Sequence, residues 1–336
     1  MILYDFEYER PKTLSEAASL LAQLGSGARA AAGGTDILPN MRLEIARPST
    51  LVSLKAIAPP APCMNADGAI SIHALTTLAG LADSELIRKE LPMLAESAHV
   101  VASNQVRQMG TIGGNLCQDT RCMYLNQKHD YQFKQPCFKR SGDVCYPFPR
   151  NDPQTCWSVH MSDTAPALIA LDAEIETVRA GGVRRFPLEA LFTGKGLRPL
   201  ALEADELVQA IIVPARGKSS GWGYYKSARR GGLEYGLAVM AATLRLDADG
   251  RTCAEARIVI GGVREKPVRA LDSERKLVGN PLTDELLAAT AAEAAEEVKP
   301  LPHHGFTKSF LTDNIRIHLR RTLVRAAARA SEASAN

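Results

Sequence analysis

The chain has 336 residues, 46% hydrophobic and 23% charged, which is enough for about two globular domains with buried cores. Its net charge of +3 comes from 40 basic and 37 acidic side chains, and this balance argues against nucleic acid or a lipid surface as partner. No run approaches the roughly 18 apolar residues of a membrane helix, and Asp5, Glu7 and Glu9 stand where a signal peptide needs an apolar stretch. We therefore expect a cytoplasmic protein.

The first regular element is a capped helix. Thr13 followed by Glu16 forms a capping box, and an apolar stripe ends at Gly25, so the pattern predicts a helix over residues 13–24. The segments that follow predict a compact unit of strand, loop, helix and strand. Its strands are expected at residues 28–32 and 50–54, and its helical turn at 36–44.

Residues 91–106 have helical periodicity and run directly into a glycine-rich loop. From residue 116 to 160 the periodicity disappears and turn formers such as Ser141-Gly142-Asp143 take over, which indicates an irregular insert. Beyond the insert we expect regular structure at 165–171, strands at 174–178 and 205–214, a linker at 216–223, alternating segments at 238–246 and 256–260, and helices at 283–298 and 312–330. The predicted domains are 1–218 and 219–330, with a frayed tail of small residues at 331–336.

Two glycine loops carry the first chemical signal. Glycines allow close backbone approach to a ligand, and the start of a following helix presents free N–H groups to a phosphate. The first loop comprises Ala31, Ala32, Gly33, Gly34, Thr35, Asp36 and Ile37. The second comprises Thr111, Ile112, Gly113, Gly114 and Asn115. One such loop is usually only a turn, but two of them suit the dispersed charge of a dinucleotide diphosphate.

Neither loop fits the G-x-G-x-x-G fingerprint or the Walker P-loop, which argues against NAD and ATP sites. At this order and spacing, the loops resemble those of the flavin subunits of the xanthine oxidase and carbon monoxide dehydrogenase family. The segments at residues 162–166 and 225–230 agree with the same family. The resemblance implies an α+β fold: a two-part FAD-binding domain of the vanillyl-alcohol-oxidase/carbon monoxide dehydrogenase flavoprotein type, here with a cysteine-rich insert, followed by a smaller α+β C-terminal domain.

The same resemblance implies a role for individual side chains. It places the FAD diphosphate on the two glycine loops, Val101 beside the flavin nucleotide, Asp163 at a polar edge of FAD, and Lys226 against the cofactor from the second domain. The residues alone leave other interpretations open. The alternative for Asp163 is the cap of the following helix, and the alternative for Lys226 is a solvated lysine on a strand.

Cysteine is the outlier of the composition, because five of the seven cysteines lie between Cys117 and Cys156. In a cytoplasmic chain such a cluster is more often a metal site than a disulfide framework. Four of them, Cys122, Cys137, Cys145 and Cys156, are separated by 14, 7 and 10 residues. This spacing fits neither zinc ribbons nor bacterial ferredoxins, yet an insert without a core of its own gains order from ligation.

Around these cysteines the insert resembles that of the 4-hydroxybenzoyl-CoA reductases, a branch of the same family, through Arg121-Cys122 and Gly142-Asp143-x-Cys145. That resemblance implies a [4Fe-4S] cluster on the four cysteines. Cys117 is the spare thiol, which we expect to pack near the FAD loop, whereas Cys63 and Cys253 read as ordinary small apolar residues. A structural zinc, or reduced thiols without metal, remains the alternative.

No substrate-activating constellation is evident in the sequence, so we expect a chain that relays electrons. The resemblance implies partners: a large molybdopterin subunit, a small subunit with two [2Fe-2S] clusters, and ferredoxin as electron donor. The implied reaction is removal of the para hydroxyl of 4-hydroxybenzoyl-CoA in anaerobic aromatic breakdown. The rivals are an oxidative molybdenum hydroxylase acting on another aromatic or heterocyclic substrate, and a stand-alone flavin oxidoreductase with a zinc-stapled loop.

Overall fold

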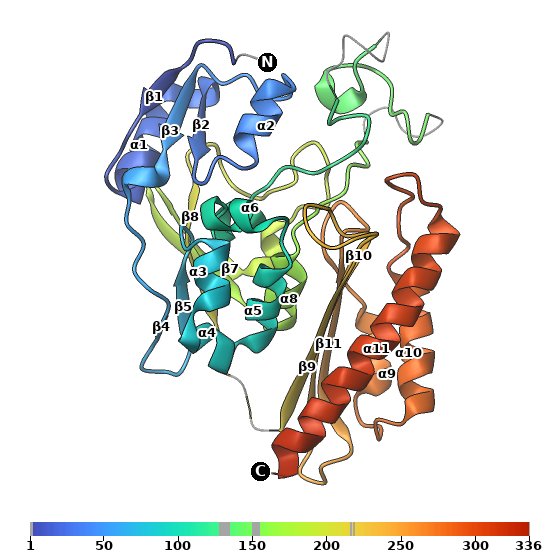
Figure 1. The fold of residues 1–336 in the computed structure, drawn as a ribbon. Helices are drawn as coiled ribbons and strands as arrows, with labels where there is room; N and C mark the ends of the chain where they lie inside the picture. Colours follow the sequence, from blue (N-terminus) through green and yellow to red (C-terminus); the bar gives the residue numbers. More distant parts are fainter. Residues whose placement is uncertain (1–2, 128–134, 150–154, 216, 218, 336) are drawn as a thin grey trace.

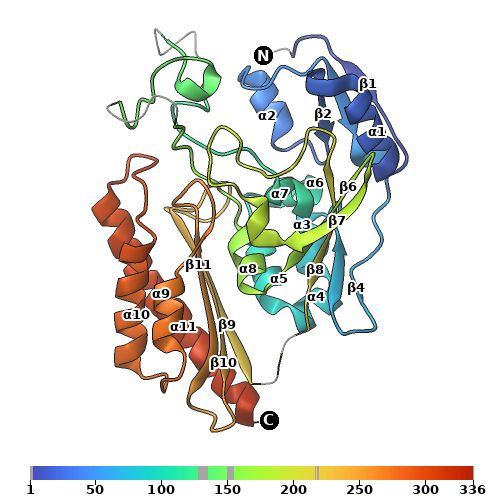
Figure 2. The same ribbon diagram turned by 180° about the vertical axis from the view of Figure 1, so that it is seen from behind.

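The computed structural model describes residues 3–127, 135–149, 155–215, 217 and 219–335. The blue-to-yellow N-terminal part forms two small sheets and a group of short helices, and the orange-to-red C-terminal part lies beside it as one sheet covered by long helices (Figures 1 and 2). Residues 216, 218 and 336 of the predicted linker and tail fall outside the described ranges. In those ranges, no helix is both long and apolar enough to cross a membrane.

The N-terminal unit is a three-stranded parallel sheet in the order β1-β3-β2. Its elements are β1 (Glu7–Glu9), α1 (Leu14–Leu24), β2 (Ala28–Ala31), α2 (Ile37–Arg42) and β3 (Thr50–Ser53). Thr13 caps α1 by accepting from the Glu16 N–H at 3.1 Å, while the Glu16 carboxylate accepts from the Lys12 N–H at 2.8 Å. The predicted capping box therefore closes one residue earlier than expected, and the predicted strand–loop–helix–strand unit is confirmed.

A five-stranded antiparallel sheet follows, in the order β4-β5-β8-β6-β7. Its strands are β4 (Cys63–Met64), β5 (Ile70–His73), β6 (Glu174–Arg179), β7 (Gly182–Pro187) and β8 (Leu207–Val213). The accompanying helices are α3 (Leu78–Asp83), α4 (Glu85–Glu90), α5 (Pro92–His99), α6 (Asn104–Met109), α7 (Ile112–Leu116) and α8 (Thr164–Ala170). Short 3-10 turns occupy Gly25–Gly27, Leu54–Ala56, Phe138–Arg140 and Leu188–Leu191.

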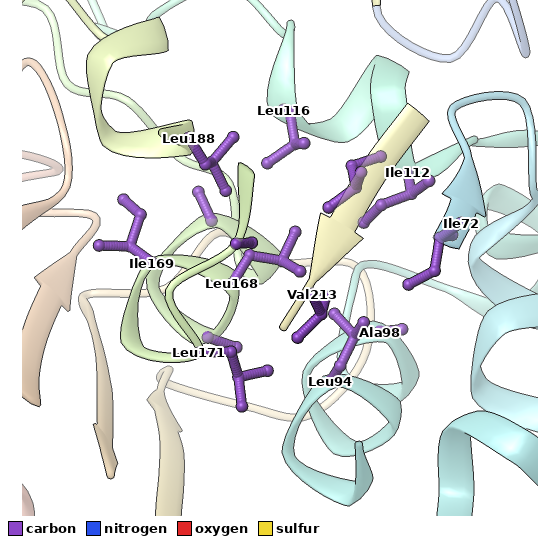
Figure 3. Packing of buried hydrophobic residues seen from close by; sticks show 14 of the residues in the cluster. Ile72, Leu94, Ala98, Ile112, Leu116, Leu168, Ile169, Leu171, Leu188 and Val213 are labelled. Atoms are coloured by element: carbon purple, nitrogen blue, oxygen red, sulfur yellow. The ribbon is translucent and has the colours of Figure 1, made fainter. Parts of the chain in front are cut away.

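The main core joins this sheet to its helices. Figure 3 shows Ile72 and Val213 from the strands facing Leu94 of α5 and Leu168 of α8. All four are inaccessible to solvent, and burying a side chain of this size contributes about 1.5–3 kcal/mol. This core holds both ends of the second glycine loop, since Ile112 is one of its members.

The C-terminal domain is a four-stranded antiparallel sheet, β12-β11-β10-β9, with three helices on one face. Its elements are β9 (Ser220–Ser227), β10 (Ala238–Leu246), β11 (Cys253–Gly261), β12 (Val268–Arg269), α9 (Leu271–Leu277), α10 (Asp284–Glu297) and α11 (Lys308–Ala335). Along β10, Val239 and Ala241 join the main core, whereas Met240 and Leu244 pack in a second core with α9–α11. Both faces are covered, which explains the nearly continuous apolar run of this strand.

Residues 91–106 are not one helix as predicted. The chain leaves α5 after His99, passes through Ala102 with a φ of 43°, and restarts at α6. Ser103 caps α6 by accepting from the Val106 N–H at 3.4 Å. A serine side chain that satisfies the backbone locally favours a helix start over a helix interior, and apolar periodicity does not register this competition.

The predicted linker at 216–223 is also only partly right, because β9 already begins at Ser220. Gly221 and Gly223, which read as linker residues, lie under α11. A Cβ on Gly221 would stand 2.0 Å from the Ala326 carbonyl oxygen, so the glycines are required by a close strand–helix approach.

The tail predicted to fray at 331–336 is instead helical as far as Ala335. Ala330 is fully buried where α11 crosses β9, and alanine has the highest intrinsic helix propensity. The small side chains therefore extend the helix rather than end it.

Candidate functional site

Two adjoining cavities lie at the glycine loops, with volumes of about 740 and 180 Å³. Both are lined by Thr35, Asp36, Thr111 and Gly114, so they meet at the point where the two loops face each other. Of the predicted residues, the larger cavity is also lined by Ala31, Ala32, Gly33, Gly34, Ile37 and Gly113, and the smaller by Val101, Asn115 and Asp163. Two predicted residues are missing from both linings: Ile112, whose side chain is buried in the main core, and Lys226.

The first loop connects the end of β2 to the start of α2. Gly34 has a φ of 75°, a conformation that glycine adopts without strain. In the described part of the chain, no backbone carbonyl accepts a hydrogen bond from the N–H groups of Gly33, Gly34 or Thr35. Three consecutive N–H groups at a cavity wall form a binding surface for an anion.

The second loop is built differently. Thr111 caps α7 by accepting from the Gly114 N–H at 3.1 Å, and the Gly113 N–H donates to the Ala74 carbonyl oxygen at 2.8 Å. These donors already have partners in the protein. A Cβ on Gly114 would touch only the Thr111 hydroxyl, at 3.0 Å, so this glycine leaves open space in the cavity. The two loops were predicted as equivalent, but the first offers donors and the second offers room.

Gly33 has a further reason to be glycine. A Cβ at this position would lie 1.9 Å from the carbonyl oxygen of Met109, just before the second loop. The two loops therefore touch through their backbones.

Asp163 and Lys226 form a buried ion pair between the two domains. The Lys226 ammonium lies 2.7 Å from Asp163 Oδ2 and also donates to the Val100 carbonyl oxygen at 3.1 Å. Burial raises the pKa of Asp163 to about 6, although the neighbouring Lys226 charge lowers it. The other carboxylate oxygen, Oδ1, is buried and has no hydrogen-bond partner among the residues that the structure describes, and Asp163 lines the smaller cavity.

The alternative interpretations of this pair are wrong. Asp163 makes no capping hydrogen bond to α8; the Ser162 hydroxyl accepts from the Ala165 N–H at 3.0 Å instead. The side chain of Lys226 is only 7% exposed, so it is not a solvated strand lysine. A buried carboxylate with one satisfied and one unsatisfied oxygen is suited to a ligand that donates a hydrogen bond.

Asn115 is fixed at the wall between these groups. Its Oδ1 accepts from the hydroxyls of Ser162 and Thr164, both at 2.6 Å. This leaves the Nδ2 donors available to a ligand in the smaller cavity, which Asn115 lines together with Val101.

The structure brings all four predicted metal ligands, Cys122, Cys137, Cys145 and Cys156, around one small cavity of about 20 Å³. Backbone hydrogen bonds close the turns that carry three of them: the N–H groups of Leu125, Arg140 and Phe148 donate to the carbonyl oxygens of Cys122, Cys137 and Cys145 at 3.1, 2.8 and 3.1 Å. Burial raises the pKa of each of these three thiols, and the N–H groups oppose that rise. Backbone N–H groups that lower a thiol pKa favour the thiolate over the thiol.

The remaining cysteines lie elsewhere. Cys117 lines the larger cavity, and burial raises its pKa to about 12. Cys253 is buried in the second core, whereas Cys63 is exposed on β4, so Cys63 does not pack as the small apolar residue that was expected. Across the described ranges, no three His, Cys, Asp or Glu side chains gather closely enough to hold a single metal ion.

Known families match both parts of the chain. Residues 4–216 match the family described as the FAD binding domain in molybdopterin dehydrogenase, and residues 223–327 match the CO dehydrogenase flavoprotein C-terminal domain. The chain belongs to the molybdopterin dehydrogenase flavoprotein family. It is therefore an FAD-binding oxidoreductase subunit, and the two adjoining cavities together lie within the roughly 300–1,000 Å³ of ordinary ligand sites.

Individual proteins that are similar to this flavoprotein over most of its length support the family assignment. It is 31% identical over 301 residues to the carbon monoxide dehydrogenase medium chain of Hydrogenophaga pseudoflava, which covers 89% of each chain. It is 32% identical over 312 residues to the aldehyde oxidoreductase FAD-binding subunit of Escherichia coli, covering 88% of this chain and 94% of that one. A solved structure of the Hydrogenophaga pseudoflava carbon monoxide dehydrogenase superposes with a TM-score of 0.79 at 29% identity, covering 98% of this chain and 99% of the other.

Two basic residues of the flavoprotein's site were not among the predicted cofactor-binding residues. Arg121 pairs with Asp36 of the first loop, donates to Asn40 at 3.0 Å and lies 5.6 Å from the ring centre of Tyr235. Lys139 is, within the described ranges, the one residue that lines both the larger cavity and the cysteine cavity. Arg121 was marked in the sequence only as the neighbour of Cys122, and Lys139 is an isolated basic residue in an aperiodic segment, so the tertiary structure identifies the place of both at the cavities.

Proposed function

We propose that this chain is the electron-transfer subunit of a molybdenum-dependent reductase, holding FAD in its two adjoining cavities and a [4Fe-4S] cluster on Cys122, Cys137, Cys145 and Cys156. One observation carries the proposal. Cysteines dispersed over residues 122–156 surround one cavity, and that cavity shares Lys139 with the larger flavin cavity. FAD exchanges one or two electrons and a cluster exchanges one, so neighbouring sites for both suit a relay.

For the flavin, the unpaired N–H groups of Gly33, Gly34 and Thr35 provide donors to the diphosphate. Gly114 leaves room where the two cavities join. In the smaller cavity, the unpaired Oδ1 of Asp163 accepts a hydrogen bond from the polar edge of the ring system, while Lys226 holds the other oxygen. Val101 lines the same cavity as an apolar wall.

For the cluster, the supporting observation is the donor set. Buried thiols with raised pKa values stay protonated until a metal displaces the proton, and the backbone N–H groups that lower these pKa values then favour the thiolates. The four thiolates of a cubane bind four different iron atoms, so they surround a volume rather than converge on one point as zinc ligands do.

The finer assignment rests on the resemblance of the insert to that of the 4-hydroxybenzoyl-CoA reductases. It makes the reaction the reductive removal of the para hydroxyl of 4-hydroxybenzoyl-CoA to give benzoyl-CoA, on the molybdenum of a large partner subunit. Electrons pass from ferredoxin through this chain to a small subunit with two [2Fe-2S] clusters. Such a relay needs a stable heteromeric complex, with an interface of well over ~1,000 Å².

A second candidate is an oxidative molybdenum hydroxylase acting on a different aromatic or heterocyclic substrate. Its support is that two of the relatives are named as subunits of a carbon monoxide dehydrogenase and an aldehyde oxidoreductase. In that case the cysteine cavity serves as an outlet for electrons rather than an inlet.

The deciding experiment is performed on the native complex purified anaerobically. We expect noncovalent FAD, about four iron and four sulfide per chain beyond those of the partners, and formation of benzoyl-CoA from 4-hydroxybenzoyl-CoA with reduced ferredoxin. Oxidation of substrate coupled to ferredoxin reduction would favour the second candidate. Zinc in place of iron in a chain that is catalytically complete alone would instead identify a stand-alone flavin oxidoreductase.

A further inference from the structure

A chain of hydrogen bonds leads from one sulfur of the cysteine cavity to the edge of the flavin cavity. The Cys156 sulfur lies 3.1 Å from the Ser158 hydroxyl, which lies 2.5 Å from the Thr120 hydroxyl. The Thr120 oxygen accepts from the Lys139 ammonium at 2.6 Å, and Lys139 also pairs with Asp119 at 2.5 Å. The last two residues both line the larger cavity.

The side chains that form these hydrogen bonds are buried and have few alternative hydrogen-bond partners. Thr120 is fully buried, Ser158 is 2% exposed, and the side chain of Lys139 is 10% exposed. Apart from Ser158, the acceptor recorded for the Thr120 hydroxyl is the Gly196 carbonyl oxygen, at the longer distance of 3.5 Å. The geometry therefore holds the two hydroxyls in line between the ammonium and the sulfur.

The chemistry of Lys139 and of a metal-bound Cys156 determines which group donates and which accepts in each of these hydrogen bonds. A lysine ammonium only donates hydrogen bonds, so the Thr120 oxygen must accept from it and turn its own hydrogen toward its nearer acceptor, Ser158. A thiolate bound to iron only accepts, so Ser158 must donate to Cys156. Every hydrogen bond then points from Lys139 toward the sulfur, and bonds aligned in this way polarise one another.

We infer that Lys139, Thr120 and Ser158 are positioning residues that direct a hydrogen bond to the Cys156 thiolate and thereby raise the reduction potential of the cluster. The inference rests on the proposed function, because it needs a cluster on Cys156. A hydrogen bond to a ligand sulfur stabilises the more negative, reduced state of a cluster. Because Lys139 also borders the flavin cavity, one cation acts on the cluster from the side at which the two cofactor sites meet.

The test is an anaerobic redox titration of the purified native complex, followed by electron paramagnetic resonance of the cubane. Thr120→Val removes the hydroxyl at nearly constant shape, and Thr120→Ser restores it. We expect Thr120→Val, Ser158→Ala and Lys139→Met each to lower the midpoint potential, with Thr120→Ser close to wild type. A tenfold smaller ratio of reduced to oxidised cluster at fixed potential corresponds to a shift of about 59 mV.

The control is Tyr146→Phe, which removes a hydroxyl in the same insert that donates to the Gln135 carbonyl oxygen at 2.7 Å. Its potential should equal that of the wild type. If Ser158→Ala loses iron, Thr120→Val and Lys139→Met decide, because in the chain of hydrogen bonds both are separated from the Cys156 sulfur by Ser158. Variants that retain iron and FAD at an unchanged potential would overturn the inference alone, whereas a wild-type complex without the insert's iron would overturn the proposed function and this inference with it.

Discussion

The flavin cavity and the cysteine cavity are ordered by different physical means. The flavin loops lie at the ends of regular elements: the first connects β2 to α2, and the second opens α7, whose Ile112 is buried in the main core. The described part of the insert consists mainly of turns, with one 3-10 turn at Phe138–Arg140 and isolated bridges such as Arg121 to Val159. Packing therefore fixes the flavin loops, whereas ligation would have to supply much of the order of the insert.

This difference predicts which mutations should affect only one of the two cavities. A flavin cavity supported by the hydrophobic core should survive damage to the insert, because Gly33, Gly34 and Gly114 take their positions from elements outside it. The insert, in contrast, is tied to the flavin side through polar contacts, such as those of Arg121 with Asp36 and of Lys139 with Asp119. Loss of its metal should loosen the insert without emptying the flavin cavity.

The largest expected effect is on iron. Replacing Cys122 and Cys145 together by serine should remove nearly all iron and sulfide belonging to this chain, because half the thiolates of the cavity are lost. FAD should largely remain. The measurement is iron, sulfide and flavin analysis of the anaerobic complex. Cys63→Ser, on exposed β4, is the control, and Cys117→Ser should also spare the iron. A full cluster in the double variant would show that the ligands are misassigned.

The corresponding change on the flavin side is Gly114→Val. The added side chain fills space where the two cavities join, so we expect most of the FAD to be lost while the iron stays. Gly181→Val is the matched control, because a Cβ at Gly181 meets nothing within 4 Å and the residue lies in the turn between β6 and β7. The measurement is the flavin-to-protein ratio of each variant after gel filtration. Equal flavin content in the two variants would contradict the role of the second loop.

The buried Asp163 predicts a pH dependence that needs no ligand. Because its pKa in the folded chain is about 6 rather than 3.8, the folded state binds the proton more tightly. Its contribution to stability is therefore present at low pH and is lost as the pH rises through about 6. For a buried group this amounts to about 3 kcal/mol, an order-of-magnitude figure from 1.36 kcal/mol per pKa unit.

The measurement is urea unfolding of the flavin-free subunit between pH 4 and 7, for the wild type and Asp163→Asn. The difference between their free energies of unfolding should shift in favour of the variant by about 3 kcal/mol as the pH rises. A difference that does not change with pH would mean that the carboxyl group titrates normally in the folded chain.

The smallest expected effect distinguishes a helix cap that serves only the fold from one that also contributes to the flavin site. Thr111 and Thr13 both cap helices by accepting from a backbone N–H at 3.1 Å, but only Thr111 lines the cavities. Thr111→Val and Thr13→Val should each lower the free energy of unfolding by about 1 kcal/mol. Only Thr111→Val should weaken FAD binding, as measured by flavin titration of the stripped subunit. Equal flavin affinity in both variants would show that the Thr111 cap serves the fold alone.

Several features of this protein follow from the sequence alone, because they depend on neighbours along the chain. The helix after Thr13 is specified by a local cap and an apolar stripe, and the first glycine loop by its place between a strand and a helix. Clustering and resemblance together predict one set of metal ligands, Cys122, Cys137, Cys145 and Cys156. The structure places the four around one cavity.

Tertiary structure decided what depends on contacts between distant segments. From the sequence, the glycines at 221 and 223 are predicted to lie in a linker, but in the structure α11 crosses them. The sequence also allows Asp163 to be a helix cap, whereas the structure pairs it with Lys226, 63 residues away. The alignment of Lys139, Thr120 and Ser158 on Cys156 likewise joins residues 119–120, 139 and 156–158. No periodicity records such contacts, because they arise only when the core brings separate segments to the same place.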